Sequence, residues 1–146
     1  MAKVDKSVLV PHSVEQMFTL VDEVESYPAF LPWCAGASVV GRTDAGPIAR
    51  IEINFRGVRA HFTTANRNLP PNTIHISLRD GPFRLLEGVW QFRRLASNAS
   101  KVEFMLQYEF ATRVLEALIG PVFDNIADSF VDAFVKRADS VYGVPP

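Results

Sequence analysis

Apolar residues recur at every second position in the middle of the chain and about every 3.6 positions near its end. This change of period constrains the fold more than any other feature of the sequence. Between residues 35 and 110 apolar and polar side chains alternate, most clearly over 49–55 and 102–110. Such alternation is typical of half-buried strands. In the last 30 residues the apolar positions recur at helical spacing. The sequence therefore predicts an antiparallel sheet with one apolar face, followed by a long amphipathic helix over about 122–142.

The beginning of the chain predicts one more strand and two short helices. Residues 3–10 alternate and are rich in valine, which favours a strand. Ser13 and Gln16 have the spacing of a capping box, so a short helix is expected over 13–21. A second short helix or turn is expected over 24–31, because the prolines in this stretch prevent a longer regular helix.

The order of these elements predicts an α+β fold. We expect a single domain over residues 1–146, in which a curved antiparallel sheet of about seven strands wraps a long C-terminal helix. Gly120 and Pro121 are expected to kink that helix or restart it. A twisted sheet does not follow a straight helix along its whole length. We therefore expect an apolar space between the two, which is the usual form of a small-molecule site.

Charge is distributed unevenly along the chain. The formal net charge is −1, yet residues 42–94 contain nine arginines against four acidic residues, and the segments on either side are net acidic. Arginine suits phosphate recognition, but a solvated sheet face is also rich in charge. The sequence does not show whether these arginines contact RNA phosphates, anionic lipid headgroups or only water. The residues expected to contact RNA or a membrane are Arg56, Arg59, Arg84 and Arg93.

The sequence lacks the motifs that indicate a catalytic or a metal-binding site. His12, His61 and His75 have no metal-ligand spacing and are expected at the surface, and the single Cys34 forms no intrachain disulfide. There is no phosphate-binding glycine loop and no nucleophile elbow. We expect no catalytic residue, no metal and no required cofactor. Without a signal peptide or an apolar stretch of bilayer length, the expected location is cytoplasmic, with a peripheral position at the inner membrane as the alternative.

Three stretches carry a resemblance to a known family. Segment 24–34 reads VESYPAFLPWC, and segment 81–92 reads GPFRLLEGVWQF. The third segment runs from GPVF at 120–123 through VDAFVKRA at 131–138. They resemble the coenzyme Q-binding and ribosome-association-toxin family, also described as polyketide cyclase/dehydrase-like, and the resemblance covers essentially the whole chain. It implies the START-like helix-grip fold and favours a bacterial member, since eukaryotic members carry a mitochondrial presequence.

The resemblance implies a non-enzymatic protein, in one of two roles. Members linked to respiration bind ubiquinone or a related polyprenyl quinone in the apolar cavity, and one bacterial branch is a toxin that binds the large ribosomal subunit and prevents subunit association. We rank quinone binding in support of respiratory electron transport first and ribosome-directed inhibition second. A small cyclase or dehydratase is the third alternative. The sequence does not fix the oligomeric state.

Aromatic residues with a polar group suit a quinone headgroup, because they offer a flat apolar surface and a hydrogen-bonding group together. Tyr27, Phe30 and Trp33 fall in the irregular segment that is expected to form the cavity mouth. Trp90 and Tyr108 face inward by alternation, and plain core packing is the alternative for both. The expected ligand-binding residues are Tyr27, Phe30, Trp33, Phe62, Thr64, Trp90, Tyr108, Phe123 and Phe130.

Overall fold

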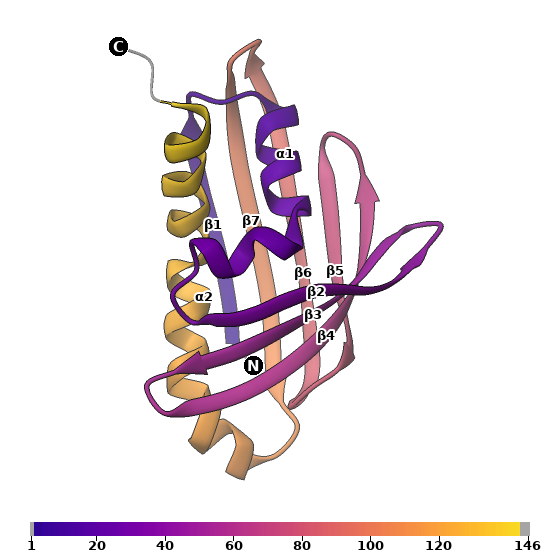
Figure 1. Ribbon diagram of the computed structural model, residues 1–146, viewed down its shortest axis with the longest axis vertical. Coiled ribbons are helices and arrows are strands. Elements are labelled where there is room, and N and C mark those ends of the chain that lie inside the picture. Colours follow the sequence, from indigo (N-terminus) through magenta and orange to yellow (C-terminus); the bar gives the residue numbers. More distant parts are fainter. Residues whose placement is uncertain (1, 144–146) are drawn as a thin grey trace.

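Seven strands form one antiparallel sheet in the computed structural model, which describes residues 2–143 (Figure 1). The elements in chain order are β1 (Ala2–Val10), α1 (Val14–Asp22), the 3₁₀ helix η1 (Val24–Ala29), β2 (Cys34–Thr43), β3 (Gly46–Phe55), β4 (Val58–Leu69), β5 (Thr73–Asp80), β6 (Phe83–Ala96), β7 (Ala99–Phe110) and α2 (Arg113–Tyr142). The predicted α+β fold with about seven strands and a long C-terminal helix is confirmed.

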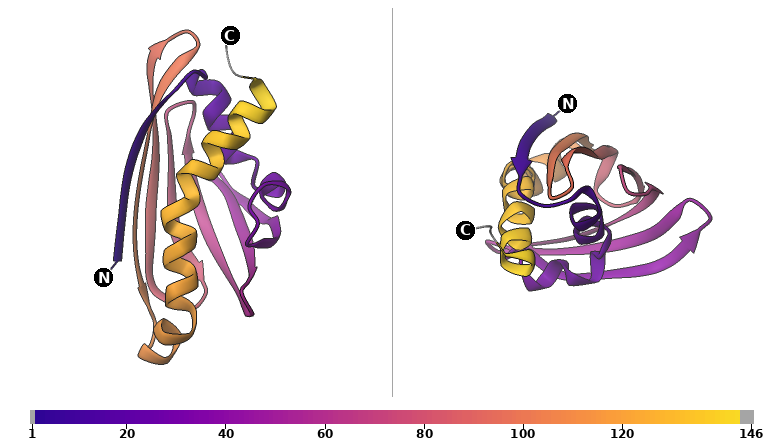
Figure 2. Two further views of the ribbon diagram at one scale, coloured as in Figure 1. Left: turned by 90° about the vertical axis from the view of Figure 1, so that its left-hand side faces the viewer. Right: turned by 90° about the horizontal axis from the view of Figure 1, so that it is seen from above.

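The sheet is a meander that the first strand closes at one edge. Its order is β1-β7-β6-β5-β4-β3-β2, so β1 pairs with the last strand and β2 forms the opposite edge. Strands β2, β3 and β4 cross in front of the others, and from above the sheet curls around α1 while α2 closes the open side (Figures 1 and 2). Irregular pairing at Thr63/Thr64 and at Val39/Gly41 lies along these strands. Such irregularities increase the local bend and twist of a sheet.

The two short helices lie where the capping pattern predicts them. The Ser13 hydroxyl accepts from the Gln16 N–H, and the Gln16 side chain accepts from the Ser13 N–H, so the expected capping box is present. Helix α1 then buries Val14, Met17 and Leu20 against the concave face of the sheet. Helix η1 follows directly and leads the chain across to β2.

Helix α2 is continuous over 30 residues, or about 45 Å at 1.5 Å per residue. A kink or a restart was expected at Gly120 and Pro121, and the restart is wrong, because the helix includes Pro121. Residues on both sides of the proline, Ile119, Val122 and Phe123, are buried. Packing of this kind supplies most of the stability of a helix in a protein, so it offsets the hydrogen bond that proline cannot donate.

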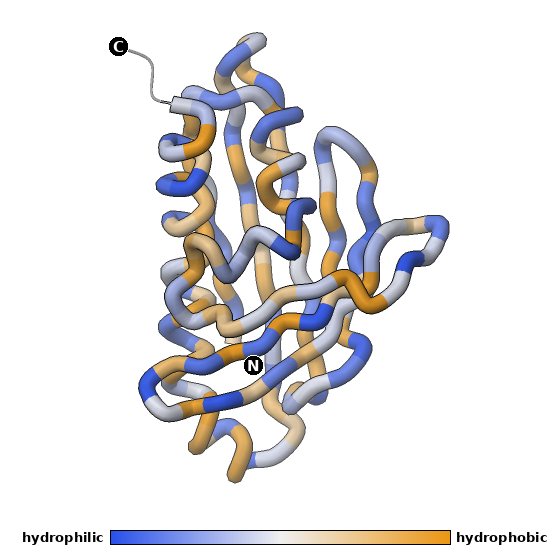
Figure 3. The backbone as a smooth tube through the Cα atoms, viewed as in Figure 1, coloured by the Kyte–Doolittle hydropathy of each residue, from blue (hydrophilic) through white to orange (hydrophobic). Residues whose placement is uncertain are grey.

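The core lies between the concave face of the sheet and the helices. Hydropathy alternates along the strands in Figure 3, as expected for a sheet with one buried face. Trp90, Phe104 and Phe134 are among the largest fully buried side chains, and they bring β6, β7 and α2 together. The opposite, convex face of the sheet faces solvent and carries most of the polar strand residues.

Candidate functional site

A small, partly open apolar cavity lies between the sheet and α2. Its volume is about 70 Å³. Its lining residues are Trp33, Phe62, Ile76, Leu86, Phe104, Leu106, Phe123, Ile126, Ala127 and Phe130. All of these side chains are apolar apart from the indole N–H, and the rings of Trp33 and Phe130 lie 6.1 Å apart. A dry cavity of about 150 Å³ is known to hold benzene, so this cavity is too small for a quinone ring as it stands.

The structure places four of the nine expected ligand-binding residues at this cavity: Trp33, Phe62, Phe123 and Phe130. Trp90 is 1% exposed and packs against Phe104 with ring centroids 4.4 Å apart, so it lies behind the cavity wall. The Thr64 hydroxyl donates to the Asn66 side chain at 2.9 Å. These two side chains are therefore parts of the core and of β4 rather than of the cavity surface.

The two expected tyrosine hydroxyls are already hydrogen-bonded within the protein. The Tyr27 hydroxyl donates to the Val21 carbonyl, and the Tyr108 hydroxyl donates to the Asp124 carboxylate. Burial raises the pKa of Tyr27 well above its usual value. Burial, together with the hydrogen bond to Asp124, raises the pKa of Tyr108 as well. Both side chains are neutral donors at physiological pH, and neither presents a free hydroxyl to a ligand.

Tyr27 and Trp33 were expected to be exposed at the mouth of the cavity, but both side chains are buried. Tyr27 is 7% exposed because η1 turns its ring onto Phe134, with centroids 5.2 Å apart. Trp33 is 5% exposed, while Phe30 is half-buried. Phe30 and Trp33 nevertheless line an open groove of about 590 Å³ between this segment and α2. Trp33 lines both the groove and the internal cavity, so this side chain separates the two spaces.

His12 is not a surface histidine, contrary to expectation. It is 2% exposed, and its Nε2 lies 2.7 Å from a carboxylate oxygen of Asp139. The corner between β1 and α1 is covered by the end of α2, and the Ser100 hydroxyl donates to the His12 carbonyl there. The pair therefore joins the C-terminal end of α2 to the sheet. Only contacts between distant segments bury this side chain, so alternation along the sequence does not reveal it.

Residues 2–143 contain neither a cluster of metal-ligating side chains nor a helix that could span a membrane. No three histidine, cysteine or acidic side chains in this range lie close enough together to hold a metal ion. None of its helices has the length and apolar character needed to span a bilayer. Cys34 is buried, and burial raises the pKa of its thiol, which disfavours the reactive thiolate.

The convex side of β4 and β5 carries a row of positive and titratable side chains. Strand register places Arg67 directly opposite His75, while Arg59 and His61 lie opposite Asn54 and Glu52 of β3. We define the basic face as Arg59, His61, Arg67, His75 and Arg79, all of which are exposed. The distance from Arg59 to Arg67 along β4 is about 26 Å at 3.3 Å per residue. Arg59 and His61 also line a shallow hollow of about 360 Å³ beside Glu52.

Ion pairing divides the arginines of residues 42–94 by strand. On β6, Arg84 pairs with Glu109, Arg93 with Glu103 at 2.5 Å, and Arg94 with Glu15. Arg50 on β3 lies 3.6 Å from Glu52. Within the part of the chain that the structure describes, no carboxylate lies within 4.0 Å of the remaining five: Arg42, Arg56, Arg59, Arg67 and Arg79. The arginines without an ion pair therefore concentrate on β2 to β5.

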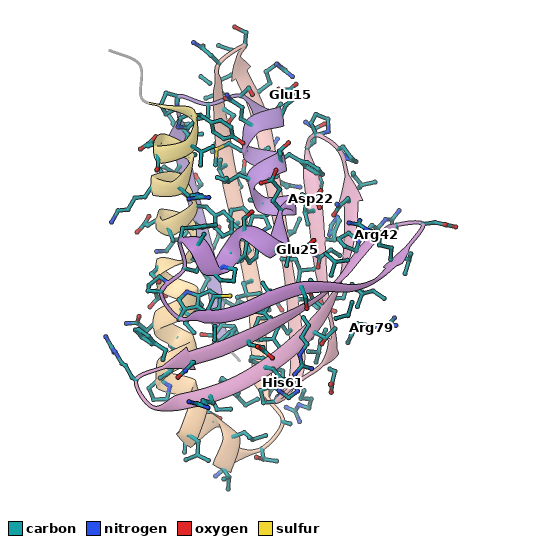
Figure 4. The ribbon with its side chains drawn as sticks, viewed as in Figure 1. Glu15, Asp22, Glu25, Arg42, His61 and Arg79 are labelled. Carbon is teal, nitrogen blue, oxygen red and sulfur yellow. The ribbon has the colours of Figure 1, made fainter. Side chains whose placement is uncertain are left out.

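The acidic residues of the short helices lie apart from this region. In Figure 4, Glu15, Asp22 and Glu25 lie along α1 and η1, whereas Arg42 on β2 and Arg79 on β5 lie to their right and His61 on β4 lies below them. Charge is thus separated across the molecule although its net value is only −1. A separated charge of this kind creates a local positive potential that attracts anionic partners.

Two of the four arginines expected to contact RNA or a membrane, Arg56 and Arg59, have no ion pair in the described range. The Arg56 guanidinium lies over the Phe55 ring, 4.8 Å from its centroid. Arg84 and Arg93 are instead neutralised by glutamates of β7. Sequence reasoning did not single out Arg67 and Arg79. What distinguishes them is their partners in space: Arg67 lies opposite His75, whereas the arginines of β6 form ion pairs with Glu109, Glu103 and Glu15.

Comparison with known proteins agrees with this architecture. Residues 10–135 match the family described as polyketide cyclase / dehydrase and lipid transport. The ribosome association toxin RatA of Vibrio cholerae is 41% identical over 98% of this chain and 99% of its own length. The mitochondrial coenzyme Q-binding protein COQ10 homolog B of Xenopus laevis is 28% identical, over 94% of this chain and 58% of its own.

The solved structures support the same assignment at the level of the fold. A START superfamily protein from Mycobacterium smegmatis superposes with a TM-score of 0.78 at 23% identity, over 95% of this chain and 98% of its own. A likeness at this identity shows the helix-grip fold alone, since one fold supports many functions. The curved seven-stranded sheet, the long C-terminal helix and the match over residues 10–135 together show that this chain belongs to the polyketide cyclase/dehydrase and lipid transport family.

Proposed function

We propose that this protein associates with the ribosome and hinders subunit association, and that the basic face contacts ribosomal RNA. The observation that carries the proposal is the concentration of arginines without an ion pair on β2 to β5. The relative from Vibrio cholerae, which aligns along its whole length, is named a ribosome association toxin. We therefore rank ribosome association above quinone binding, whereas the sequence alone favours quinone binding.

The physical basis of the proposal is the phosphate backbone. Arginines that already form ion pairs gain little from a phosphate, because they must give up a carboxylate to bind it. Arg59, Arg67 and Arg79 have no such partner among residues 2–143 and lie on one sheet face. Their contact with RNA would release counterions, so the affinity would fall steeply with salt. Sheet residues that contact the backbone recognise the shape of a duplex rather than its sequence.

The test is cosedimentation with purified large ribosomal subunits over a series of salt concentrations. We compare the wild type with the triple variant R59Q/R67Q/R79Q and with R84Q/R93Q/R94Q, which has the same formal charge change but removes ion-paired arginines. The negative slope of log affinity against log salt should become shallower by about 2 to 3 in the first variant, since each phosphate contact contributes about 0.7 to 0.9. The second variant should keep most of the wild-type slope.

Two results would overturn the proposal. Failure of the wild type to sediment with large subunits at low salt would exclude the association itself. Equal loss in both triple variants would show that net charge, rather than the basic face, governs the association.

A second candidate is binding of an apolar ligand, and the wholly apolar cavity beneath Trp33 favours it. The relative from Xenopus laevis is named a coenzyme Q-binding protein. A polyprenyl quinone would need the cavity of about 70 Å³ to open toward the groove, which requires Trp33 to move. Mass spectrometry of an organic extract of the purified native protein tests this. Recovery of a quinone in near-stoichiometric amount would support the candidate, and an empty extract from protein isolated under mild conditions would count against it.

A further inference from the structure

The groove beside Trp33 differs from the internal cavity in having a charged wall. On one side it is lined by Ala29, Phe30, Pro32 and Trp33, and on the other by Ser129, Asp132, Ala133, Lys136, Arg137 and Ser140 of α2. The α2 residues recur at intervals of three and four, so they form a single stripe along the helix. The groove therefore has one aromatic wall and one polar wall, in a space of about 590 Å³.

Arg137 is the unusual residue of this groove. Its guanidinium lies over the Phe30 ring, 5.2 Å from the centroid, which holds it in place by a cation–π contact. Its Nε atom is buried and has no hydrogen-bond partner. Among residues 2–143 no carboxylate lies within 4.0 Å of this side chain. A buried charged donor without an acceptor is costly, and few such groups persist in folded proteins without a reason.

The neighbouring groups make the polar wall net positive. Lys136 is exposed and adds a second cation beside Arg137. Asp132 is the one carboxylate among the groove-lining residues, and the Asp139 carboxylate nearby along α2 is held by His12. The wall thus presents two cations against one acid. An oxyanion in the groove would give the Arg137 guanidinium a charged acceptor, and charge-assisted hydrogen bonds to arginine are among the strong ones.

We propose that this groove binds a single-chain anionic amphiphile, with its carboxylate or phosphate on Arg137 and Lys136 and its apolar body along Phe30, Pro32 and Trp33. The volume of the groove lies within the range usual for small-molecule sites. The proposal is independent of ribosome association, because the groove lies at α2 and the basic face on the convex side of β4 and β5. A ligand of this groove must carry a negative charge, whereas a ligand of the apolar cavity need not.

The chain offers a convenient probe of this groove. It contains two tryptophans, and Trp33 lines the groove while Trp90 is 1% exposed in the core. The two indole N–H signals in a ¹⁵N-correlated NMR spectrum can be assigned with a W33F variant. We titrate the 146-residue chain with decanoate and, separately, with decanol, which has the same chain length and no charge. Decanoate should shift the Trp33 signal saturably, and decanol should bind at least about tenfold more weakly.

Variants then test the charged wall. R137Q should weaken decanoate binding about tenfold or more, as expected for a lost hydrogen bond to a charged group. R137K, which keeps the charge but loses the planar guanidinium, should retain part of the affinity. R113Q is the matched control, because Arg113 is an exposed arginine at the first residue of the same helix, about 36 Å along its axis. Thermal melting of each variant shows whether the fold is intact.

Several results would overturn the proposal. Equal affinity for decanoate and decanol would show that the groove does not recognise charge. An unchanged affinity in a folded R137Q variant would exclude Arg137, and equal weakening in R113Q would show that general charge is responsible. Absence of any saturable shift at Trp33 would exclude the site. A parallel titration with decyl phosphate shows whether the groove prefers a phosphate or a carboxylate.

Discussion

Filling the internal cavity from α2 should stabilise the protein. Ala127 lines the cavity and is 2% exposed, so Ala127→Val places two additional carbon atoms in a space of about 70 Å³. A closed, empty cavity costs about 24 cal/mol per Å³, which sets an upper limit of about 1.7 kcal/mol for this partly open one. The two added carbons recover about 1.6 kcal/mol of burial, whereas valine costs up to about 0.7 kcal/mol in a helix. We expect a net gain of about 1 kcal/mol.

Urea unfolding at neutral pH measures this change, provided that the slope with denaturant is the same in both proteins. Ala133→Val is the matched control. It carries the same helix cost on the same helix, but Ala133 lines the open groove rather than the cavity, so we expect a small loss of stability. If Ala127→Val is no more stable than Ala133→Val, the reasoning about the cavity is refuted. Ala127→Val also distinguishes ribosome association from binding of an apolar ligand. It should block a ligand that enters the cavity and leave ribosome association unchanged.

The remaining predictions concern buried polar groups. Asp139→Ala removes the carboxylate from buried His12 and should cost about 1 to 3 kcal/mol of unfolding free energy, whereas Asp132→Ala on the exposed side of α2 should be nearly neutral. At alkaline pH the raised pKa values of Tyr27 and Tyr108 keep both protonated in the folded protein while tyrosines of the unfolded chain ionise. The contribution of these two tyrosines to the unfolding free energy should therefore be constant below about pH 10 and fall above it by up to about 1.4 kcal/mol per pH unit for each tyrosine. Urea unfolding measured on both sides of about pH 10 checks this, and Tyr27→Phe should show a shallower fall.

The fold was predictable because its signals are local. Alternation over 49–55 and 102–110, the Ser13 and Gln16 capping pair and the helical repeat of the last 30 residues each depend on neighbours in sequence. The structure confirms all three as β3 and β7, α1 and α2. Only the expected restart at Pro121 differs, because packing around Ile119 and Phe123 carries the helix through the proline.

The candidate site was less predictable, because it depends on which distant segments meet. Alternation shows that Arg93 and Arg67 both face outward, but it does not show that Glu103 lies beside the first. In the same way, the burial of His12 depends on the end of α2, more than 120 residues later. Tyr27 and Trp33 lie in a segment without a regular repeat, so their inward direction could not be derived from periodicity.

The pairing of β1 with β7 has a consequence for how the chain is made. Segments about 100 residues apart meet in this pair, as in Ala2 opposite Tyr108 and Val10 opposite Ser100. The meander from β2 to β7 joins consecutive strands and forms through short loops, whereas β1 must wait until about 110 residues have been synthesised. Until then β1 has no partner strand, and an unpaired strand invites pairing with another chain. During synthesis, the first strand of this sheet is therefore the last one to be paired.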